Sequence, residues 1–322
     1  MQANFEKVGS KLLYKKAFAL FAVLILFSSG CFGGLSSEEV IKIGTWRTAQ
    51  TIQPFFYENY VDFPIEVLPF TNPGDQKTAL LAGSLHMCGT TLVTAIIAAS
   101  QNEPILIVAA LSNKCSALVV GIDSGIETEA DLRGKTIAYV PGTMHHLLLL
   151  SVLNQNGISV EEVTLIRVDF FDMGLALRQG QIDAFLSGEP FPSMAQLEGF
   201  GKILSYPYFE DEMGTINSAM ITTRDMVENN PALVQALVNA HIQSSRYLIE
   251  NPDSWLAKSI TFGNDPDVLR FSFNNIELRY HIDERYISQV KVLAQKMYDL
   301  GMITNVPDVE AMFNLEFLGT YT

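Results

Sequence analysis

Short apolar segments alternate with segments of helical periodicity from residue 40 onward. Apolar runs of four to seven residues, bounded by Gly, Pro or polar residues, predict buried strands, and longer periodic runs predict helices. In the first part of the chain, strands are predicted over 40–46, 65–68, 85–88, 105–110 and 117–120, and helices over 55–59, 78–82 and 92–100. Strands and helices that alternate at this spacing are typical of parallel sheets covered by helices.

The same alternation then starts again. Strands are predicted over 136–140, 163–168, 182–186 and 216–222, helices over 142–153 and 174–178, and long helical stretches follow to the end. The run Ala79-Leu80-x-x-Gly83-x-Leu85 recurs as Ala176-Leu177-x-x-Gly180-x-Ile182, in register with the alternation. The sequence therefore predicts an α/β protein of two related lobes, each a doubly wound sheet with flanking helices.

The order of the elements also predicts where the chain passes between lobes. We expect lobe one to comprise residues 39–121 and 219–322, and lobe two residues 122–218. Two such lobes enclose a cleft and close on a ligand by a hinge motion, and ligands of open α/β sheets bind beyond the carboxyl ends of the strands.

The first 38 residues have a different character. Four lysines (7, 11, 15 and 16) precede the apolar run 17–27, which is too short to span a bilayer as a helix and is typical of a signal peptide over residues 1–30. Gly30 before Cys31 resembles a bacterial lipoprotein cleavage site, although Ser28 stands where an aliphatic residue is usual. We expect a lipid on Cys31 and a linker to residue 38; the alternative is an ordinary signal peptide beside a free cysteine.

Charge and cysteine content restrict the function. The net charge is −14, and cleavage of residues 1–30, with four Lys and one Glu, leaves −17. Such an acidic chain has no electrostatic footprint for nucleic acid. Cys88 and Cys115 lie in apolar runs without metal-site spacing; they are either buried thiols or, after export, a disulfide.

Polar segments follow several predicted strands and are the candidates for ligand contact. Helix-start N–H groups and Thr hydroxyls there donate to an anion, whereas the alternative for each Thr is a helix cap. The candidate ligand-binding residues are Thr45, Trp46, Gly89, Thr90, Thr91, Asn113, Gly142, Thr143, His145 and Glu189.

Three of these positions have competing interpretations. Trp46 either covers the ligand or lies buried in a hinge, and Glu189 favours an amine, a metal-bridged anion or a hydrogen-bonding heterocycle. His145 and His146 point about 100° apart on a helix, so one is expected to face the cleft while the other packs or meets solvent.

Motifs of enzymes and metal sites are missing from the sequence. Gly134-Lys135-Thr136 is similar to the end of a phosphate-binding loop, but Glu129 stands where that loop needs a glycine. There is no Gly-x-Ser-x-Gly elbow and no Cys/His spacing for zinc. We expect no metal and no cofactor. Catalytic groups need not be close in sequence, so the expectation of no catalytic residues depends on the export signal instead.

The stretch 126–157 carries a family resemblance. It contains Asp131-Leu132-Arg133-Gly134-Lys135-Thr136, then Pro141-Gly142-Thr143-Met144-His145 and an apolar helix ending at Gly157. With Gly180-Gln181-Ile182-Asp183-Ala184, it resembles the solute-binding proteins for taurine, aliphatic sulfonates, nitrate and bicarbonate, a group that also includes binders of thiamine-related pyrimidines.

The resemblance implies a two-lobed periplasmic-binding-protein fold of type II. It implies capture of a small ligand and delivery to an ABC permease and its ATPase. The predicted signal peptide and Cys31 add a place outside the cytoplasm on a lipid anchor. It places residues 89–91, Thr143, His145 and 188–190 around the ligand, whose identity stays open because Cys115-Ser116 stands where taurine binders carry an acid. The alternatives are an enzyme on this fold, acting on a thiamine-related pyrimidine or menaquinone precursor, and a ligand-sensing module of a membrane receptor.

Overall fold

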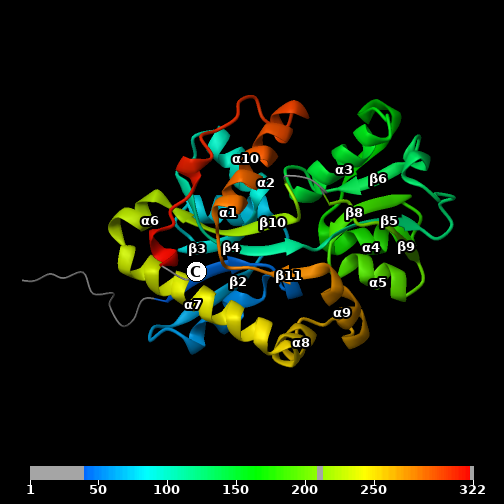
Figure 1. Ribbon diagram of the computed structural model, residues 1–322. Coiled ribbons are helices and arrows are strands. Elements are labelled where there is room, and N and C mark those ends of the chain that lie inside the picture. The colour runs from blue at the N-terminus through cyan, green and yellow to red at the C-terminus, as the bar shows by residue number, and fades with distance from the viewer. Residues whose placement is uncertain (1–39, 209–212, 320–322) are drawn as a thin grey trace, which may run out of the picture. The chain divides into compact units, whose positions relative to one another are not determined.

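The computed structural model describes residues 40–208 and 213–319, so the predicted signal peptide, Cys31 and the linker lie outside the described residues. The described strands form two sheets with helices on their faces, as predicted (Figure 1), but both sheets are mixed and not all-parallel. In these two ranges we find no helix with the length and apolar character needed to cross a membrane.

The first sheet has six strands in the order β11-β4-β10-β3-β1-β2. β1 runs parallel to β2 and β3, and β10 lies antiparallel between β3 and β4. The strands are β1 (Ile41–Thr45), β2 (Ile65–Pro69), β3 (Met87–Thr91), β4 (Ile105–Lys114), β10 (Ile216–Thr223) and β11 (Ile276–Leu278).

The second sheet has five strands in the order β7-β6-β8-β5-β9. β6 is parallel to β7 and β8, and β5 is antiparallel to both of its neighbours. In Figure 1 this sheet is green throughout, because the chain enters it once and leaves it once. The strands are β5 (Ser116–Gly121), β6 (Thr136–Tyr139), β7 (Thr164–Arg167), β8 (Ala184–Gly188) and β9 (Gly201–Ser205).

Several helices begin at a side-chain cap that the sequence supplies. Thr91, Thr143 and Asp283 accept backbone N–H groups at the starts of α2, α3 and α10. The α-helices are α1 (Pro73–Leu81), α2 (Leu92–Ser100), α3 (Met144–Gln155), α4 (Phe170–Arg178), α5 (Phe191–Leu197), α6 (Arg224–Asn229), α7 (Pro231–Glu250), α8 (Pro252–Ile260), α9 (Pro266–Ser272) and α10 (Glu284–Asp299). The 3₁₀ helices are η1 (Ala49–Thr51), η2 (Gln53–Asn59), η3 (Glu129–Leu132), η4 (Val160–Glu162), η5 (Phe273–Asn275), η6 (Glu310–Met312) and η7 (Glu316–Leu318).

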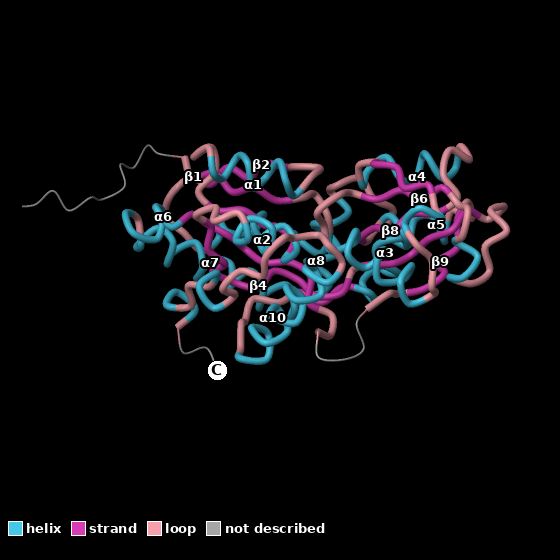
Figure 2. Tube along the Cα trace, turned by 90° about the horizontal axis from the view of Figure 1, so that it is seen from above, coloured by secondary structure: helices cyan, strands magenta, loops and turns pink. Residues whose placement is uncertain are grey.

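The core follows the two-residue period of the strands. In β5, Leu118 and Val120 join one buried cluster and Val119, between them, joins another. Figure 1 shows the corresponding covers of the second sheet, with α3 on one side and α4 and α5 on the other; Figure 2 gives the view from above. The larger cluster also includes residues of the first sheet, because α2 packs against α3.

The chain crosses between the sheets at Cys115, not near Gly121. β4 ends at Lys114 and β5 begins at Ser116, and Lys114 and Cys115 have left-handed φ angles of 60° and 69°. The return strand β10 begins at Ile216, before the predicted boundary at 219. These positions differ from the predicted boundaries, because the sharp turn at Lys114-Cys115 contains neither Gly nor Pro, the residues that usually mark such a turn. The strands of the first sheet lie within residues 40–114 and 216–319 and those of the second within 116–205, and we call these two groups of residues lobe one and lobe two.

Candidate functional site

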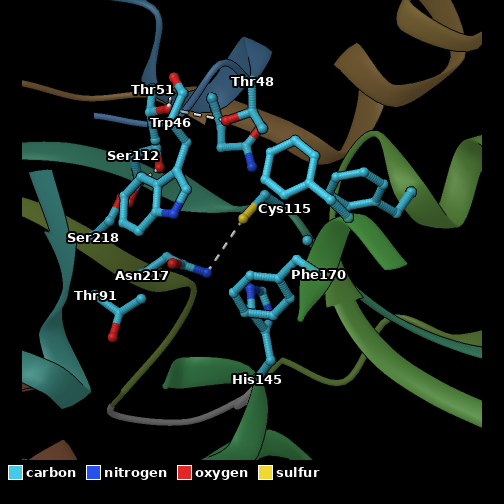
Figure 3. A pocket seen from close by; sticks show the side chains of 14 residues that line it. Trp46, Thr48, Thr51, Thr91, Ser112, Cys115, His145, Phe170, Asn217 and Ser218 are labelled. Carbon is cyan, nitrogen blue, oxygen red and sulfur yellow. Dashed lines mark hydrogen bonds between the residues drawn. The ribbon is translucent and has the colours of Figure 1, made fainter. Parts of the chain in front are cut away.

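A pocket lies between the two lobes, where β1, β3 and β8 end and β10 begins (Figure 3). It encloses about 450 Å³ of space free of protein atoms, its open mouth included. Lobe one contributes Trp46, Thr48, Gln50, Thr51, Thr91, Ser112, Asn217 and Ser218. Lobe two contributes His145, Phe170, Phe171, Gly188 and Phe191, and Cys115 lies at the crossover.

The loop after β1 forms the upper part of the lobe-one wall in Figure 3. Thr51 Oγ1 donates to the carbonyl of Trp46 over 3.2 Å, and Thr48 Oγ1 lies 2.9 Å from Thr51 Oγ1. These bonds fold the loop back on itself and hold the Trp46 ring, which is 7% exposed, against the pocket. Trp46 Nε1 and Gln50 Oε1 are buried atoms without a hydrogen-bond partner in the described structure.

Polar residues on β4 and β10 form the rest of this wall. Ser112 Oγ and Ser218 Oγ lie 2.7 Å apart across the two strands. Asn217 Nδ2 donates to the carbonyl of Lys114 over 2.7 Å and lies 3.4 Å from the Cys115 sulfur. Because β10 runs antiparallel, it brings its first residues to the edge where β3 and β4 end.

His145, in the first turn of α3, forms part of the lobe-two wall. Its Nδ1 lies 3.1 Å from Ser116 Oγ, and its ring meets Phe170 edge-on at 5.1 Å. Burial lowers the pKa of His145 to about 3, so the imidazole is neutral at physiological pH. A Cβ at Gly188 would lie 3.1 Å from His145 Nε2, so the glycine gives the ring its room.

His146 takes the other direction from the same helix. Its ring packs against Tyr139 at 4.7 Å, and the backbone N–H of Gly142 donates to its Nδ1 over 3.4 Å. His146 does not line the pocket, which is the divergence expected of neighbours on a helix.

Three of the predicted ligand residues line this pocket: Trp46, Thr91 and His145. Thr91 caps α2, and its Oγ1 lies 2.9 Å from Thr94 Oγ1. Capping and ligand contact, treated as alternatives from the sequence, are thus compatible at this residue.

Three others lie in the strands behind the pocket. Thr45 Oγ1 donates to the carbonyl of Thr51, and a Cβ at Gly89 would lie 2.8 Å from a methyl group of Leu111. Thr90 is fully buried in β3, and its Oγ1 has no partner in the described structure. These residues shape the first sheet beneath the pocket wall.

Gly142, Thr143 and Asn113 have structural partners of their own. The Gly142 carbonyl accepts a 3.0 Å bond from Thr94 Oγ1 of the opposite lobe. Thr143 is fully buried; its Oγ1 donates to the carbonyl of Val140 over 2.8 Å and accepts from the N–H of His146 over 3.2 Å. Asn113 Nδ2 donates to Glu277 over 3.1 Å, beside a separate polar cleft.

Glu189, the last predicted residue, belongs to a buried polar group next to the pocket. Its carboxylate accepts from Ser193 Oγ over 2.6 Å and from Asn275 Nδ2 over 3.1 Å, and its N–H donates to the Cys115 carbonyl over 2.8 Å. Tyr208 contacts Asn275 Oδ1 and accepts from the N–H of Ser116 over 2.9 Å. We call these residues, Cys115, Ser116, Glu189, Ser193, Tyr208 and Asn275, the crossover cluster.

Burial dominates the electrostatics of the crossover cluster. Glu189 is completely buried, and burial raises the pKa of its carboxyl to about 7 despite the bonds from Ser193 and Asn275. Burial also raises the pKa values of the Cys115 thiol and the Tyr208 hydroxyl. Cys88 and Cys115 are both free and buried.

Sequence reasoning missed most of the lobe-two wall. Phe170 and Phe171 begin α4 directly after a strand, and Phe191 follows Glu189-Pro190 in the first turn of α5. The sequence pattern that could have indicated Phe170 and Phe171 was an aromatic pair at the end of a predicted strand. Asn217 and Ser218 were also missed, and their signal was two polar residues inside an otherwise apolar strand.

The pocket has the chemistry of a binding site. Of the described residues, none with a charged side chain lines it, and Arg47 next to Trp46 is exposed. In residues 40–208 and 213–319, no group of three His, Cys, Asp or Glu side chains is placed to hold a metal ion. The pocket can therefore recognise a ligand through neutral donors and acceptors on the lobe-one wall and aromatic rings on the lobe-two wall.

The chain is similar in sequence to known binding proteins. The chain is 26% identical over 225 residues, 67% of its length, to a putative aliphatic sulfonates-binding protein of Escherichia coli (strain K12), 69% of which is covered. It is 26% identical over 179 residues to the taurine-binding periplasmic protein of the same organism, with 55% of each chain covered.

Solved structures show the same fold. The alkanesulfonate-binding protein SsuA from Xanthomonas axonopodis pv. citri, bound to MOPS, superposes with a TM-score of 0.76 at 20% identity, covering 86% of this chain and 98% of that one. The profile of the family described as "NMT1/THI5 like" matches residues 53–255. Through that match, which spans more than half of its length, the chain belongs to the NMT1/THI5-like family.

Proposed function

We propose that this protein is the extracytoplasmic solute-binding component of an ABC importer and that it holds its cargo in the pocket between the lobes. The observation that carries the proposal is Trp46 Nε1, a buried donor without a partner in the described structure, on the wall of a pocket that both lobes line. A buried indole N–H usually has an acceptor, and a bound ligand supplies one.

The relatives indicate the kind of cargo. Their names refer to aliphatic sulfonates and taurine, and the SsuA structure contains MOPS, itself a sulfonate. A sulfonate presents several acceptor oxygens, which match the N–H of Trp46 and the start of α2 at Thr91. Nitrate and bicarbonate are the smaller candidates.

We infer that the protein binds without catalysis. A general base needs a pKa near the working pH and a place at the ligand. Burial keeps His145 neutral, with a pKa of about 3, and raises the pKa of the Cys115 thiol, so neither is activated. Glu189, with a pKa of about 7, lies in the crossover cluster and not on the pocket wall.

A thermal-shift screen of residues 32–322 tests the proposal. The panel holds MOPS, methanesulfonate, taurine, nitrate, bicarbonate with and without calcium, and a thiamine-related pyrimidine. A ligand that binds only the folded state raises the unfolding free energy by about 2.7 kcal/mol at a hundredfold excess over Kd. A shift that Trp46→Ala removes supports the proposal; a shift unchanged in Trp46→Ala places the ligand elsewhere.

We also propose that Cys31 carries the lipid anchor, with an ABC permease and its ATPase as partners. Cys31→Ala is expected to abolish incorporation of labelled palmitate and to release the protein from the membrane fraction. Cys88→Ala is the matched control, because Cys88 is buried in lobe one. Palmitate incorporation that persists in Cys31→Ala contradicts the anchor.

A further inference from the structure

Three phenylalanines form an aromatic wall on the lobe-two side of the pocket. Phe170, Phe171 and Phe191 come from the first turns of α4 and α5, and the rings of Phe171 and Phe191 meet edge-on at 5.0 Å. Phe171 is 41% exposed, whereas Phe170 and Phe191 are each 8% exposed. An exposed phenylalanine at the mouth of a pocket exposes apolar surface that a ligand can cover.

Trp46 faces this wall from lobe one. Figure 3 shows Trp46 and Phe170 entering the pocket from opposite sides, with Asn217 and Cys115 between them. A ligand that enters between the lobes is therefore flanked by aromatic rings from both. Aromatic pairs add about 0.5–1.5 kcal/mol to simple area burial, so this arrangement favours a ligand with a ring.

The hydroxyl groups of lobe one have little hydrogen-bonding capacity to spare as donors. Thr94 Oγ1 donates to the Gly142 carbonyl, so the hydrogen between Thr91 and Thr94 comes from Thr91. In the same way Thr51 donates to the Trp46 carbonyl, so Thr48 donates to Thr51. The hydrogens of Thr48, Thr51 and Thr91 are therefore all used within the protein.

The remaining donors are few and uncharged. They are Trp46 Nε1 and the backbone N–H groups at the start of α2, whereas the unpartnered Gln50 atom is Oε1, an acceptor. A compact inorganic anion exchanges hydration for these uncharged contacts alone, because no charged side chain of the described residues lines the pocket. A ligand with an apolar body offsets that loss by burying the body against the rings, at about 25 cal/mol per Å².

We propose that the cargo is an aromatic compound with one compact acceptor group, its ring bound against Phe170, Phe171 and Phe191 and its acceptor bound by Trp46 Nε1. This rests on the proposed function and sharpens it, because it distinguishes the cargo from taurine, nitrate and bicarbonate. Of the three rings, that of Phe171 is the most exposed, so a substitution there tests this specificity with the least cost to folding.

Calorimetric titration with two sulfonates that share a head group separates the contribution of the ring to affinity from that of the head group. Benzenesulfonate is expected to bind at least tenfold more tightly than methanesulfonate. Phe171→Leu removes most of that difference because it weakens benzenesulfonate far more than methanesulfonate, whereas Trp46→Phe weakens both probes by a similar factor. Phe271→Leu, an exposed residue on α9 of lobe one, is the matched control and changes neither affinity.

Two results overturn the inference. If methanesulfonate, taurine or nitrate binds as tightly as benzenesulfonate, or if Phe171→Leu affects both sulfonates equally, the rings do not select the cargo, and the importer proposal stands without this inference. If no compound of the whole panel binds, the proposed function itself fails, and the inference with it.

Discussion

The pocket and the crossover cluster are neighbouring groups of buried polar side chains, and each draws residues from both lobes. They differ in hydrogen bonding. Glu189 in the cluster accepts from Ser193 and Asn275, and Tyr208 bonds to Asn275 and Ser116. The pocket instead leaves Trp46 Nε1 and Gln50 Oε1 without partners in the described structure.

The difference teaches which group binds a ligand. A saturated polar network fixes a structure, and adding a ligand to it would break existing bonds. Unpartnered buried atoms beside an open space gain bonds when a ligand arrives. Glu189 has the residue type and strand-end position expected of a ligand contact, but its partners assign it to the connection between lobes.

The largest expected effect is loss of stability without loss of binding, on breaking the crossover cluster. Glu189→Ala at pH 5 leaves Ser193 and Asn275 without their acceptor and opens a small cavity, so the unfolding free energy falls by about 3 kcal/mol. Urea denaturation measures this change, and calorimetry of the folded variant is expected to show a ligand affinity within about threefold of wild type.

Glu198→Ala is the control for this variant. Glu198 pairs with Arg178 on the exposed surface of lobe two, so its loss costs below about 1 kcal/mol. If Glu189→Ala retains its stability and loses the ligand, the roles assigned to the two groups are reversed.

The next largest expected effect is a pH dependence of the unfolding free energy that Glu189 causes. Its folded pKa of about 7 exceeds the ordinary value of 4.5, so between these pH values the folded state binds the proton more tightly. The unfolding free energy therefore falls as pH rises through this window, by roughly 1–3 kcal/mol from this group. Raised pKa values keep Cys115 and Tyr208 protonated throughout.

Glu189→Gln isolates that contribution. Between pH 5 and pH 7.5, the melting temperature of wild type is expected to fall relative to that of Glu189→Gln. The other titrating groups are the same in both proteins, so their contributions cancel in the difference. Parallel pH profiles of the two proteins would mean that Glu189 is charged and solvated in the folded state.

A variant of the pocket is expected to lose ligand affinity with little change in stability, the opposite of Glu189→Ala. Gln50→Ala removes an amide whose Oε1 has no partner in the described structure, so the unfolding free energy changes little. The affinity for a panel ligand that donates a hydrogen bond to Oε1, such as taurine, falls about tenfold, or about 1.4 kcal/mol. Gln235→Ala, outside the pocket, serves as the control; an unchanged affinity in Gln50→Ala excludes that side chain from the site.

The smallest effect concerns Thr143, which the sequence placed at the ligand. Its Oγ1 caps α3 and bonds to the Val140 carbonyl, so Thr143→Ala costs about 1 kcal/mol of stability. Ligand affinity is expected to stay within twofold of wild type. A larger loss of affinity, with the melting temperature preserved, would return Thr143 to the binding site.

Much of the fold follows from local patterns. The helix predicted over 92–100 matches α2, because an apolar run behind the Thr91 cap defines it, and the strand predicted over 65–68 matches β2 to within one residue, because a short apolar run defines it. Short elements were missed: α5, β9 and β11 are stabilised by packing between distant segments, which leaves little periodicity in the sequence.

The site was predicted less completely than the fold. The strand-end rule found Trp46, Thr91 and His145, because these residues directly follow strands or begin helices. It could not exclude Glu189, whose partner Asn275 lies 86 residues away in the sequence. It also missed Phe171, since an aromatic residue in a helix is equally typical of a core.

The most direct test follows the two indole N–H groups by ¹⁵N-edited NMR, since the chain has two tryptophans. Trp255 Nε1 already donates to the Ala49 carbonyl over 2.8 Å, whereas Trp46 Nε1 is unpartnered, and Trp46→Phe assigns the two signals. On titration with benzenesulfonate, the Trp46 signal is expected to move saturably while the Trp255 signal stays in place. Calorimetric binding with an unmoved Trp46 signal would contradict the assignment of this pocket as the ligand site.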